Sequence, residues 1–318
     1  MNMQSSLYKE LTRDQVASIM EAVFPGETVS SYTLLSGGLF NTTYRVVTSR
    51  HDVVLRMGPV HRELLLPYEH HLMAAESLTD RLCLEHGIPA SNVLHLDISK
   101  AVIDRDFMVV DRIDALPLSA PSIPEDRKPD LLRECGHLTR KLHSVTGTQF
   151  GRLANIVAGK GSSSWYEAVK EEFDEVFESA AKYCLFNGSL RDKSYRFLAQ
   201  RKEHLDAITE PRLAHCDLWA GNVLIETAGG NYRVCAIIDG DRAMFGDPAL
   251  DFAAGWMTTP EFLEGYGITT DTSSADSSRR AVYSLFFRLQ DAYIWKIEYN
   301  RDDFFEEALR TAEKILET

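Results

Sequence analysis

The sequence has little that would suit a membrane protein, a secreted protein or a nucleic-acid-binding protein. None of its apolar runs approaches the ~20 residues of a membrane span, and its first residues, MNMQSSLYKELTRDQ, lack the apolar segment of a signal peptide. Its formal net charge is −13, which disfavours nucleic acid and anionic membrane surfaces as partners. We therefore expect a cytoplasmic protein that binds neither nucleic acid nor a membrane.

The five cysteines lack the spacing of a metal or disulfide motif. No two of them form a C-x-x-C pair, and no H-E-x-x-H pattern is present. We therefore expect mostly buried free thiols in a reducing compartment. The rest of the composition, with 44% hydrophobic and 25% charged residues, is that of an ordinary globular protein. At 318 residues the chain is long enough for one large domain or two ordinary ones.

Strand patterns occur early in the chain and helix patterns occur late. The expected strands are three runs within residues 29–57, followed by 93–97, 102–103 and 107–110. The expected helices are residues 12–24, 66–86, 131–145, most of 165–208 and most of 278–317. The segment DALPLSAPSIPEDRKPD contains four prolines and indicates a change of lobe. We place the boundary there, with one lobe at residues 1–113 and the other at residues 114–318.

Three polar residues interrupt the apolar stretch LAHCDLWAGNVLIE at residues 213–226. His215, Asp217 and Asn222 fall within eight positions, between two runs that are typical of buried strands. Buried polar groups are unfavourable unless they are paired or used. This loop is therefore either a turn that satisfies its own polar groups or a functional site.

A second polar group follows the apolar run that ends at Ile238. Asp239 stands at the end of that strand, and the Gly229-Gly230 pair before it indicates a hairpin. Such a hairpin can bring Asp217, Asn222 and Asp239 close together. Their oxygen atoms suit Mg²⁺, and Asp217 would then be free to accept a proton from a substrate hydroxyl. Earlier in the chain, Gly37-Gly38 would let the backbone approach a phosphate closely.

These segments resemble the aminoglycoside phosphotransferase family, whose fold is similar to that of eukaryotic protein kinases. HCDLWAGNVLI resembles its H-x-D-x-x-x-x-N catalytic loop, and IIDGDRAMFGDPALDFA resembles its I-D-x-x-x-x-x-x-G-D-P-x-x-D-[LF]-A segment. LSGGLFNTTYRV and VVLRM resemble its nucleotide-covering strands, and ESLTDRLCLEHGIPASNVL resembles its N-lobe helix. The resemblance covers roughly residues 30–255. It implies an α+β, bilobal protein-kinase-like fold, with an antiparallel sheet and a helix in the N-lobe and a mostly helical C-lobe.

The resemblance also implies roles for individual residues. Asp217 would be the catalytic base or would orient the hydroxyl, Asn222 and Asp239 would hold Mg²⁺, and His215 would order the catalytic loop. The residues that it implies for nucleotide binding are Ser36, Gly37, Gly38, Asn41, Arg56, Glu76 and a hinge from Asp111 to Ile113.

Several of these assignments leave alternatives open. Arg56 stands where the family has a lysine or arginine that contacts phosphates, and either Glu76 or Glu69 would pair with it. Asp247 would brace the loops around the metal, as Asp251 would, or would equally well cap a helix.

Gly240 replaces the bulky aromatic residue that often follows the metal-binding aspartate. We expect this replacement to open the floor of the site.

The implied activity is Mg²⁺-dependent transfer of the γ-phosphate of ATP or GTP to a hydroxyl of a small molecule, by a monomer or a homodimer. We favour an antibiotic of the aminoglycoside, peptide or nucleoside type as the acceptor, inactivated to give resistance. A kinase of a metabolite, such as a sugar, an amino acid or a choline-like compound, is the alternative. A non-catalytic nucleotide-binding pseudokinase is a further alternative, against which the intact Asp217, Asn222 and Asp239 argue.

Overall fold

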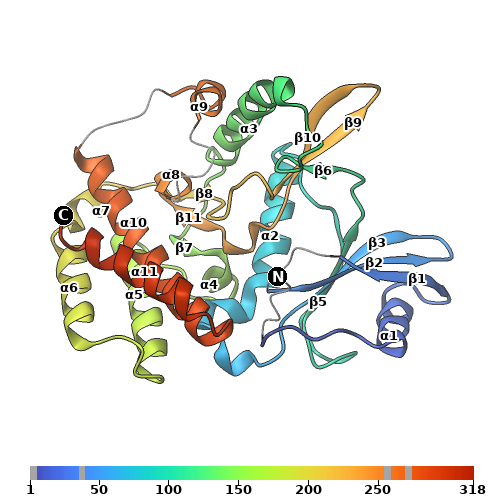
Figure 1. Cartoon of the computed structure of the whole chain (residues 1–318), viewed down its shortest axis with the longest axis horizontal. Helices are drawn as coiled ribbons and strands as arrows, with labels where there is room; N and C mark the ends of the chain where they lie inside the picture. Colours follow the sequence, from blue (N-terminus) through green and yellow to red (C-terminus); the bar gives the residue numbers. More distant parts are fainter. Residues whose placement is uncertain (1–5, 36–39, 254–258, 269–273) are drawn as a thin grey trace.

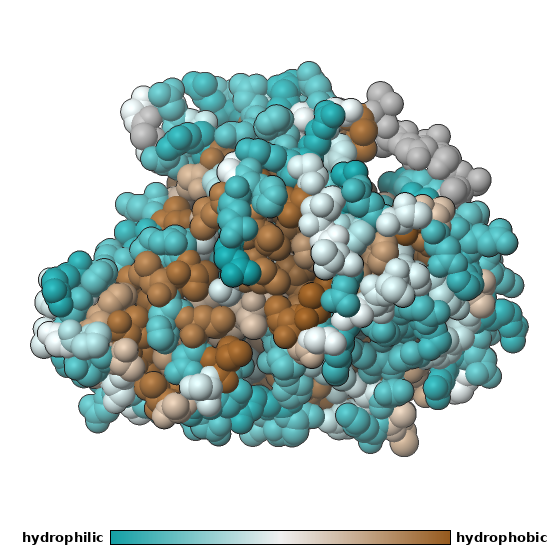
Figure 2. All heavy atoms as spheres, turned by 180° about the vertical axis from the view of Figure 1, so that it is seen from behind, coloured by the Kyte–Doolittle hydropathy of each residue, from teal (hydrophilic) through white to brown (hydrophobic). Residues whose placement is uncertain are grey.

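The computed structural model describes residues 6–35, 40–253, 259–268 and 274–318, and shows a sheet with α1 on one side and a mass of helices on the other (Figure 1). Helix α2 (Leu72–Glu85) lies between the two parts. Seen from behind, apolar side chains gather mainly over the half that carries the sheet (Figure 2). In the described ranges, no helix combines the length and apolar composition that crossing a membrane requires.

The N-terminal sheet has five antiparallel strands in the order β1-β2-β3-β5-β4. Their bounds are β1 Val29–Leu34, β2 Thr42–Thr48, β3 Asp52–Met57, β4 Val93–Asp97 and β5 Phe107–Asp111. Helix α1 (Arg13–Val23) begins with a capping box at Thr12 and packs Val16 and Ile19 against Tyr44 and Leu55 of the sheet. The alternating burial along β2 is the pattern of a strand with one buried face.

Two expectations about this lobe were wrong in detail. The predicted helix over residues 66–86 begins as a 3₁₀ turn, η2 (Pro67–His71), because the Glu69 side chain accepts a hydrogen bond from the Leu66 amide and closes a tight turn before α2. The predicted strand at residues 102–103 is a bend, and the Ile103 side chain packs against the core below α1.

The C-terminal part is mostly helical and surrounds one large apolar core, which includes Trp165, Phe173 and Phe286. Its α-helices are α3 Lys128–Leu142, α4 Leu153–Val157, α5 Trp165–Ala181, α6 Gly188–Ala199, α7 Lys202–Asp206, α8 Ala249–Ala253, α9 Pro260–Tyr266, α10 Ser274–Tyr293 and α11 Asp302–Ile315. A π-helical turn, η5 (Ile294–Glu298), joins α10 to α11, and short 3₁₀ turns lie at Glu125–Arg127 (η3) and Gly240–Arg242 (η4). A further 3₁₀ turn, η1 (Arg62–Leu64), lies in the N-terminal part between β3 and α2.

Two three-stranded sheets lie within the helical part. One has the order β10-β9-β6 and the other has the order β7-β11-β8. Their bounds are β6 Leu116–Pro117, β7 Gly151–Arg152, β8 Arg212–Ala214, β9 Val223–Ala228, β10 Asn231–Ile237 and β11 Met244–Gly246. The chain leaves the N-terminal sheet at Asp111 and joins the first of these sheets at Leu116.

The predicted hairpin is present but is not formed by the strand that leads to Asp217. It consists of β9 and β10, joined through Gly229-Gly230, both of which have positive φ. Strand β8, which leads to Asp217, pairs with β11 in the other sheet. Asp217 therefore lies on a loop between the two sheets, and Asp239 lies on the loop that connects β10 back to β11.

Candidate active site

Asp217 and Asn222 lie together on the loop from residue 215 to residue 222. The side-chain nitrogen Nδ2 of Asn222 donates to the backbone carbonyl of Asp217 at 2.8 Å and to its carboxylate oxygen Oδ2 at 3.1 Å. Burial raises the pKa of Asp217 to about 7, with Arg242 opposing the rise and Asp241 adding to it. A carboxyl group with such a pKa is suited to accept a proton near neutral pH.

His215 connects this loop to the loop of Asp239. Its ring nitrogen Nδ1 accepts from the Asp217 amide at 3.3 Å, and Nε2 donates to the Ile238 carbonyl at 3.1 Å. These partners fit one neutral tautomer, and burial lowers the pKa of His215, which favours the neutral form. The contacts are those expected of a histidine that orders the loop.

Asp251 in α8 fixes the start of the same loop through hydrogen bonds. Its carboxylate accepts the amides of His215 at 3.0 Å and Cys216 at 2.6 Å, and contacts the His143 ring at 2.8 Å. Burial alone would raise the pKa of Asp251, but the hydrogen bonds from His143 and from the His215 amide hold it below its usual value. Asp247 caps the start of α8 through the Ala249 amide.

Arg56 bridges the two lobes at the Asp239 loop. One of its terminal nitrogens, Nη1, contacts Glu76 of α2, and the other, Nη2, lies 2.6 Å from Asp239 Oδ1. Burial alone would raise the pKa of Asp239, but the charge and hydrogen bond of Arg56 hold it below its usual value. Glu69, the other candidate partner, instead accepts from the Leu66 amide. The structure therefore pairs Arg56 with Glu76.

A third carboxylate, Asp241, completes an acidic cluster. Oxygen atoms of Glu76, Asp239 and Asp241 all lie within 4.8 Å of one another. Burial and the nearby Asp239 raise the pKa of Asp241 to about 7. Carboxylate oxygens together with the amide group of Asn222 are the donor types that Mg²⁺ uses in proteins.

The expectation that Gly240 opens the floor of the site was wrong. A Cβ atom at Gly240 would lie 2.5 Å from the Cγ2 atom of Thr79 in α2, and the Thr79 hydroxyl donates to the Gly240 carbonyl at 2.8 Å. Glycine here lets α2 approach the loop closely.

The residues expected to bind nucleotide are only partly described. Ser36, Gly37 and Gly38 lie outside the described residues. Asn41 is buried, and its side-chain oxygen has no hydrogen-bond partner in the described part of the chain.

At the expected hinge, the backbone N–H of Asp111 already donates a hydrogen bond to the Asn92 carbonyl at 3.0 Å. The expected hydrogen bonds from the hinge to the nucleotide base would therefore come from the other backbone groups between Asp111 and Ile113.

The structure adds Trp219, which sequence reasoning missed, and gives Arg242, expected only as half of a charge pair with Asp241, a place near Asp217. Trp219, two positions after Asp217, is 46% exposed, and its ring lies against Gly221, where a Cβ atom would be 2.3 Å away. Arg242 lies near enough to Asp217 to affect the pKa of its carboxyl group. An aromatic residue inside a polar loop was a sequence signal for Trp219, whereas no local pattern marked the role of Arg242.

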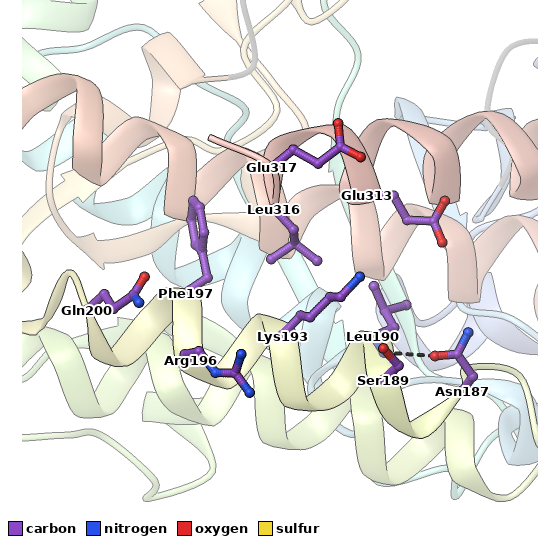
Figure 3. Close-up of a pocket in the computed structure, with 10 residues that line it drawn as sticks. All are labelled: Asn187, Ser189, Leu190, Lys193, Arg196, Phe197, Gln200, Glu313, Leu316 and Glu317. Carbon is purple, nitrogen blue, oxygen red and sulfur yellow. Dashed lines mark hydrogen bonds between the residues drawn. The ribbon is translucent and has the colours of Figure 1, made fainter.

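A cavity of about 600 Å³ lies elsewhere, between α6 and the end of α11 (Figure 3). Lys193 and Phe197 rise from one side, and Glu313 and Leu316 come from the other. None of the candidate catalytic residues lines it.

The fold and this constellation define a small-molecule phosphotransferase with a bilobal, protein-kinase-like architecture. Residues 31–282 match the phosphotransferase enzyme family, and the chain belongs to that family. The predicted family, the predicted α+β fold class and the prediction of a kinase-type enzyme are thereby confirmed.

Individual relatives are distant. A "Probable ketoamine kinase" of Lactiplantibacillus plantarum is 23% identical over 270 residues, which cover 80% of this chain and 85% of the relative.

The structure of a thermostable mutant of the aminoglycoside phosphotransferase APH(4)-Ia, with AMP-PNP and hygromycin B, is 19% identical with a TM-score of 0.65, covering 95% of this chain and 98% of that one. A protein of Haemophilus somnus 129PT, provisionally named fructosamine-3-kinase, is 14% identical with a TM-score of 0.67, covering 95% and 96% of the two chains.

Proposed function

We propose that this enzyme transfers the γ-phosphate of ATP or GTP to a hydroxyl group of a small molecule, with Asp217 as the base. The observation that carries the proposal is the contact between Asp217 and Asn222, next to the loop on which Arg56 meets Asp239. Phosphoryl transfer depends mainly on positioning and on charge neutralisation, and this arrangement offers groups for both tasks. Similar solved structures contain AMP-PNP, ADP or GDP, which supports a nucleotide as the donor.

Each residue has a defined role in this scheme. Asp217 accepts the proton of the acceptor hydroxyl and orients its oxygen towards the phosphate. Asn222 and Asp239 would hold Mg²⁺, which when bound would neutralise phosphate charge. Arg56, kept in place by Glu76, contacts the phosphates through its planar guanidinium group.

For the acceptor we propose a ketoamine, a sugar derivative in which the amine nitrogen is bonded to the carbon next to the keto group. The ketoamine kinase among the relatives supports this class, as does the provisionally named fructosamine-3-kinase. The exposed indole of Trp219, two residues from Asp217, offers a rigid apolar face for a sugar ring. An aminoglycoside antibiotic is the second candidate, favoured by the similarity to structures that contain hygromycin B or kanamycin.

The test is an acceptor panel with purified protein, Mg²⁺ and either ATP or GTP. Fructosyl-lysine and related ketoamines form one arm, and hygromycin B and kanamycin form the other. Mass spectrometry detects the added phosphoryl group, and the Asp217→Asn variant is the control for catalysis at this site. If only ketoamines are phosphorylated, the proposed acceptor is supported. If only the antibiotics are phosphorylated, the acceptor is an aminoglycoside, the second candidate. Binding of nucleotide without transfer to any acceptor would favour the pseudokinase alternative.

A further inference from the structure

Arg152 is a fully buried arginine that the catalytic scheme leaves unused. It ends the short strand β7, and its exposed fraction is 1%. Its Nε atom donates to Glu172 Oε2 of α5 at 2.7 Å, and its Nη2 atom donates to Gln290 Oε1 of α10 at 2.8 Å. The side-chain nitrogen of Gln290 donates to the same Glu172 oxygen at 2.6 Å. The three side chains therefore form a closed buried network, in which a planar guanidinium group anchored at two nitrogens has a fixed orientation.

The remaining nitrogen of Arg152 connects this network to the loop of Asp239. Its Nη1 atom donates to the Arg242 carbonyl at 3.2 Å, and Arg242 is the last residue of η4, the turn that begins directly after Asp239. Next to it, the Leu153 amide donates to the Ala243 carbonyl at 2.9 Å. The segment at the end of β7 therefore holds the downstream end of the turn through both a side chain and the backbone.

The turn after Asp239 needs such support because its backbone is strained. Asp239 has a left-handed conformation, with φ 66° and ψ 39°. This conformation is uncommon for residues other than glycine and persists only where the surrounding structure enforces it. The position of the Asp239 carboxylate therefore depends on the contacts that hold the turn. Three of them are the ion pair of Asp239 with Arg56, the hydrogen bond from the Thr79 hydroxyl to the Gly240 carbonyl, and the hydrogen bond from Arg152 to the Arg242 carbonyl.

Tyr68 brings the N-terminal lobe into contact with the same network. Its ring lies over Arg152, with 4.1 Å between the guanidinium carbon Cζ and the ring centroid, and its hydroxyl accepts from Arg242 Nη1 at 3.0 Å. The Tyr68 side chain is fully buried in η2, the turn before α2. Contacts between a cation and an aromatic ring are stabilising, and more so away from water. One ring thus contacts both Arg242 and the arginine that holds the Arg242 carbonyl.

We propose that Arg152 is a positioning residue, which acts together with Tyr68 to hold the turn after Asp239 in the conformation that presents the Asp239 carboxylate to a metal ion. The proposal rests on the proposed function, since it takes Asp239 as a ligand of Mg²⁺. Arg152 itself touches neither substrate nor metal, because its guanidinium group is buried among protein groups. Helices α5 and α10, which carry none of the candidate catalytic residues, thereby help to set the affinity for the metal ion.

Two conservative variants separate this role from a purely structural one. Arg152→Lys keeps the buried positive charge that Glu172 needs, but a lysine cannot donate to three acceptors in the planar fork geometry of a guanidinium group. Tyr68→Phe keeps the ring over Arg152 and removes only the hydroxyl that accepts from Arg242.

The matched control is Arg105→Lys in the N-terminal lobe. Arg105 is also buried, with an exposed fraction of 5%. Its three nitrogens donate to the Gly58 carbonyl at 2.7 Å, the Lys9 carbonyl at 2.8 Å and the Thr42 hydroxyl at 3.2 Å. None of these three acceptors belongs to the turn after Asp239. The control therefore disturbs a comparable set of buried hydrogen bonds without touching that turn.

Calorimetry measures the affinity for the ATP analogue AMP-PNP at a series of Mg²⁺ concentrations, so that no turnover is needed. The readout is the Mg²⁺ concentration that gives half of the gain in nucleotide affinity. We expect Arg152→Lys to raise this concentration by about tenfold and Tyr68→Phe to raise it by about threefold. Nucleotide affinity without Mg²⁺ should stay within about twofold of wild type in both, because the nucleotide contacts themselves are kept. Arg105→Lys should lower the thermal stability but leave the Mg²⁺ concentration within about twofold of wild type.

An unchanged Mg²⁺ concentration in Arg152→Lys would overturn the proposal, as would an equal rise in Arg105→Lys, which would show a general effect of lost stability. Tyr68→Phe removes a single oxygen atom, so it decides the question where Arg152→Lys does not fold, and a wild-type value in Tyr68→Phe overturns the proposal as well. If the expected shifts are found but the wild type transfers phosphate to no acceptor, the role of Arg152 stands and the proposed function is rejected instead.

Discussion

Replacing Gly240 with alanine tests the close contact between α2 and the loop that follows Asp239. The new Cβ atom would lie 2.5 Å from Thr79 Cγ2 and 3.1 Å from Thr79 Cβ. Carbon atoms pack at ~3.5–4.0 Å, so α2 and the loop must separate by about 1 Å. Gly240 does not have positive φ, so the backbone itself tolerates alanine. We expect the overpacking to destabilise the protein by ~1–3 kcal/mol, measured by chemical denaturation.

A second substitution shows whether that contact is the cause. Thr79→Ser removes Cγ2 but keeps the hydroxyl that donates to the Gly240 carbonyl. Thr79→Ser alone should lose about 1 kcal/mol for one buried methyl group. Combined with Gly240→Ala, it should restore stability and give a coupling energy of ~1 kcal/mol or more. Gly188→Ala is the control, because a Cβ atom there meets nothing within 4 Å.

If Gly240→Ala is as stable as the wild type, the close contact with Thr79 does not limit the space at residue 240. If the stability changes of Gly240→Ala and Thr79→Ser simply add, the two residues do not interact, and the reasoning is refuted as well.

Three further predictions concern the site. Asp217→Asn should lower kcat by about a hundredfold or more, since general-base groups contribute that much, while nucleotide affinity measured by calorimetry stays close to wild type. Asp239→Ala should remove the Mg²⁺ dependence of nucleotide binding, and an unchanged response to metal concentration would place the metal elsewhere. Arg56→Ala and Glu76→Ala should each weaken nucleotide binding and should be less than additive together, because the two side chains form one ion pair. Strict additivity would leave Arg56 as an independent contact.

A last prediction concerns stability at mildly acidic pH. Because the pKa of His215 is lowered by burial in the folded protein, the unfolded chain binds a proton more readily than the folded one. The stability that neutral His215 contributes is fully present above its unfolded pKa of ~6.5 and declines as the pH falls below it. Denaturation midpoints between neutral and mildly acidic pH should therefore fall less steeply for His215→Gln than for wild type. Parallel curves for the two proteins would contradict a buried, neutral His215.

Much of the site could be predicted because its residues are close together in sequence. Asp217 and Asn222 fall on one short loop, and the paired glycines at residues 229 and 230 indicated the hairpin that carries the chain on to Asp239. The capping box at Thr12 likewise fixed the start of α1. Such features depend on local backbone preferences and on the alternation of apolar residues, which the sequence shows directly.

Contacts between distant segments could not be predicted in the same way. The sequence shows that Gly240 lacks a side chain, but not that Thr79, 161 residues earlier, occupies the space. The pairing of β8 with β11 depends on tertiary packing and not on turn chemistry. The ion pair of Arg152 with Glu172 and the hydrogen bond of Arg152 to Gln290 also join segments that no short pattern relates.

The double contact of Arg56 has a consequence for the order in which ligands bind. In the structure its guanidinium group holds Asp239 Oδ1 at 2.6 Å, so a metal ion that takes this oxygen competes with an internal cation. Phosphate oxygens offer Arg56 a replacement partner when it releases Asp239. Metal ion and nucleotide should therefore bind with positive cooperativity, each raising the affinity for the other by the same factor. Either ligand alone should bind weakly, because it must disrupt the ion pair without giving both groups a new partner.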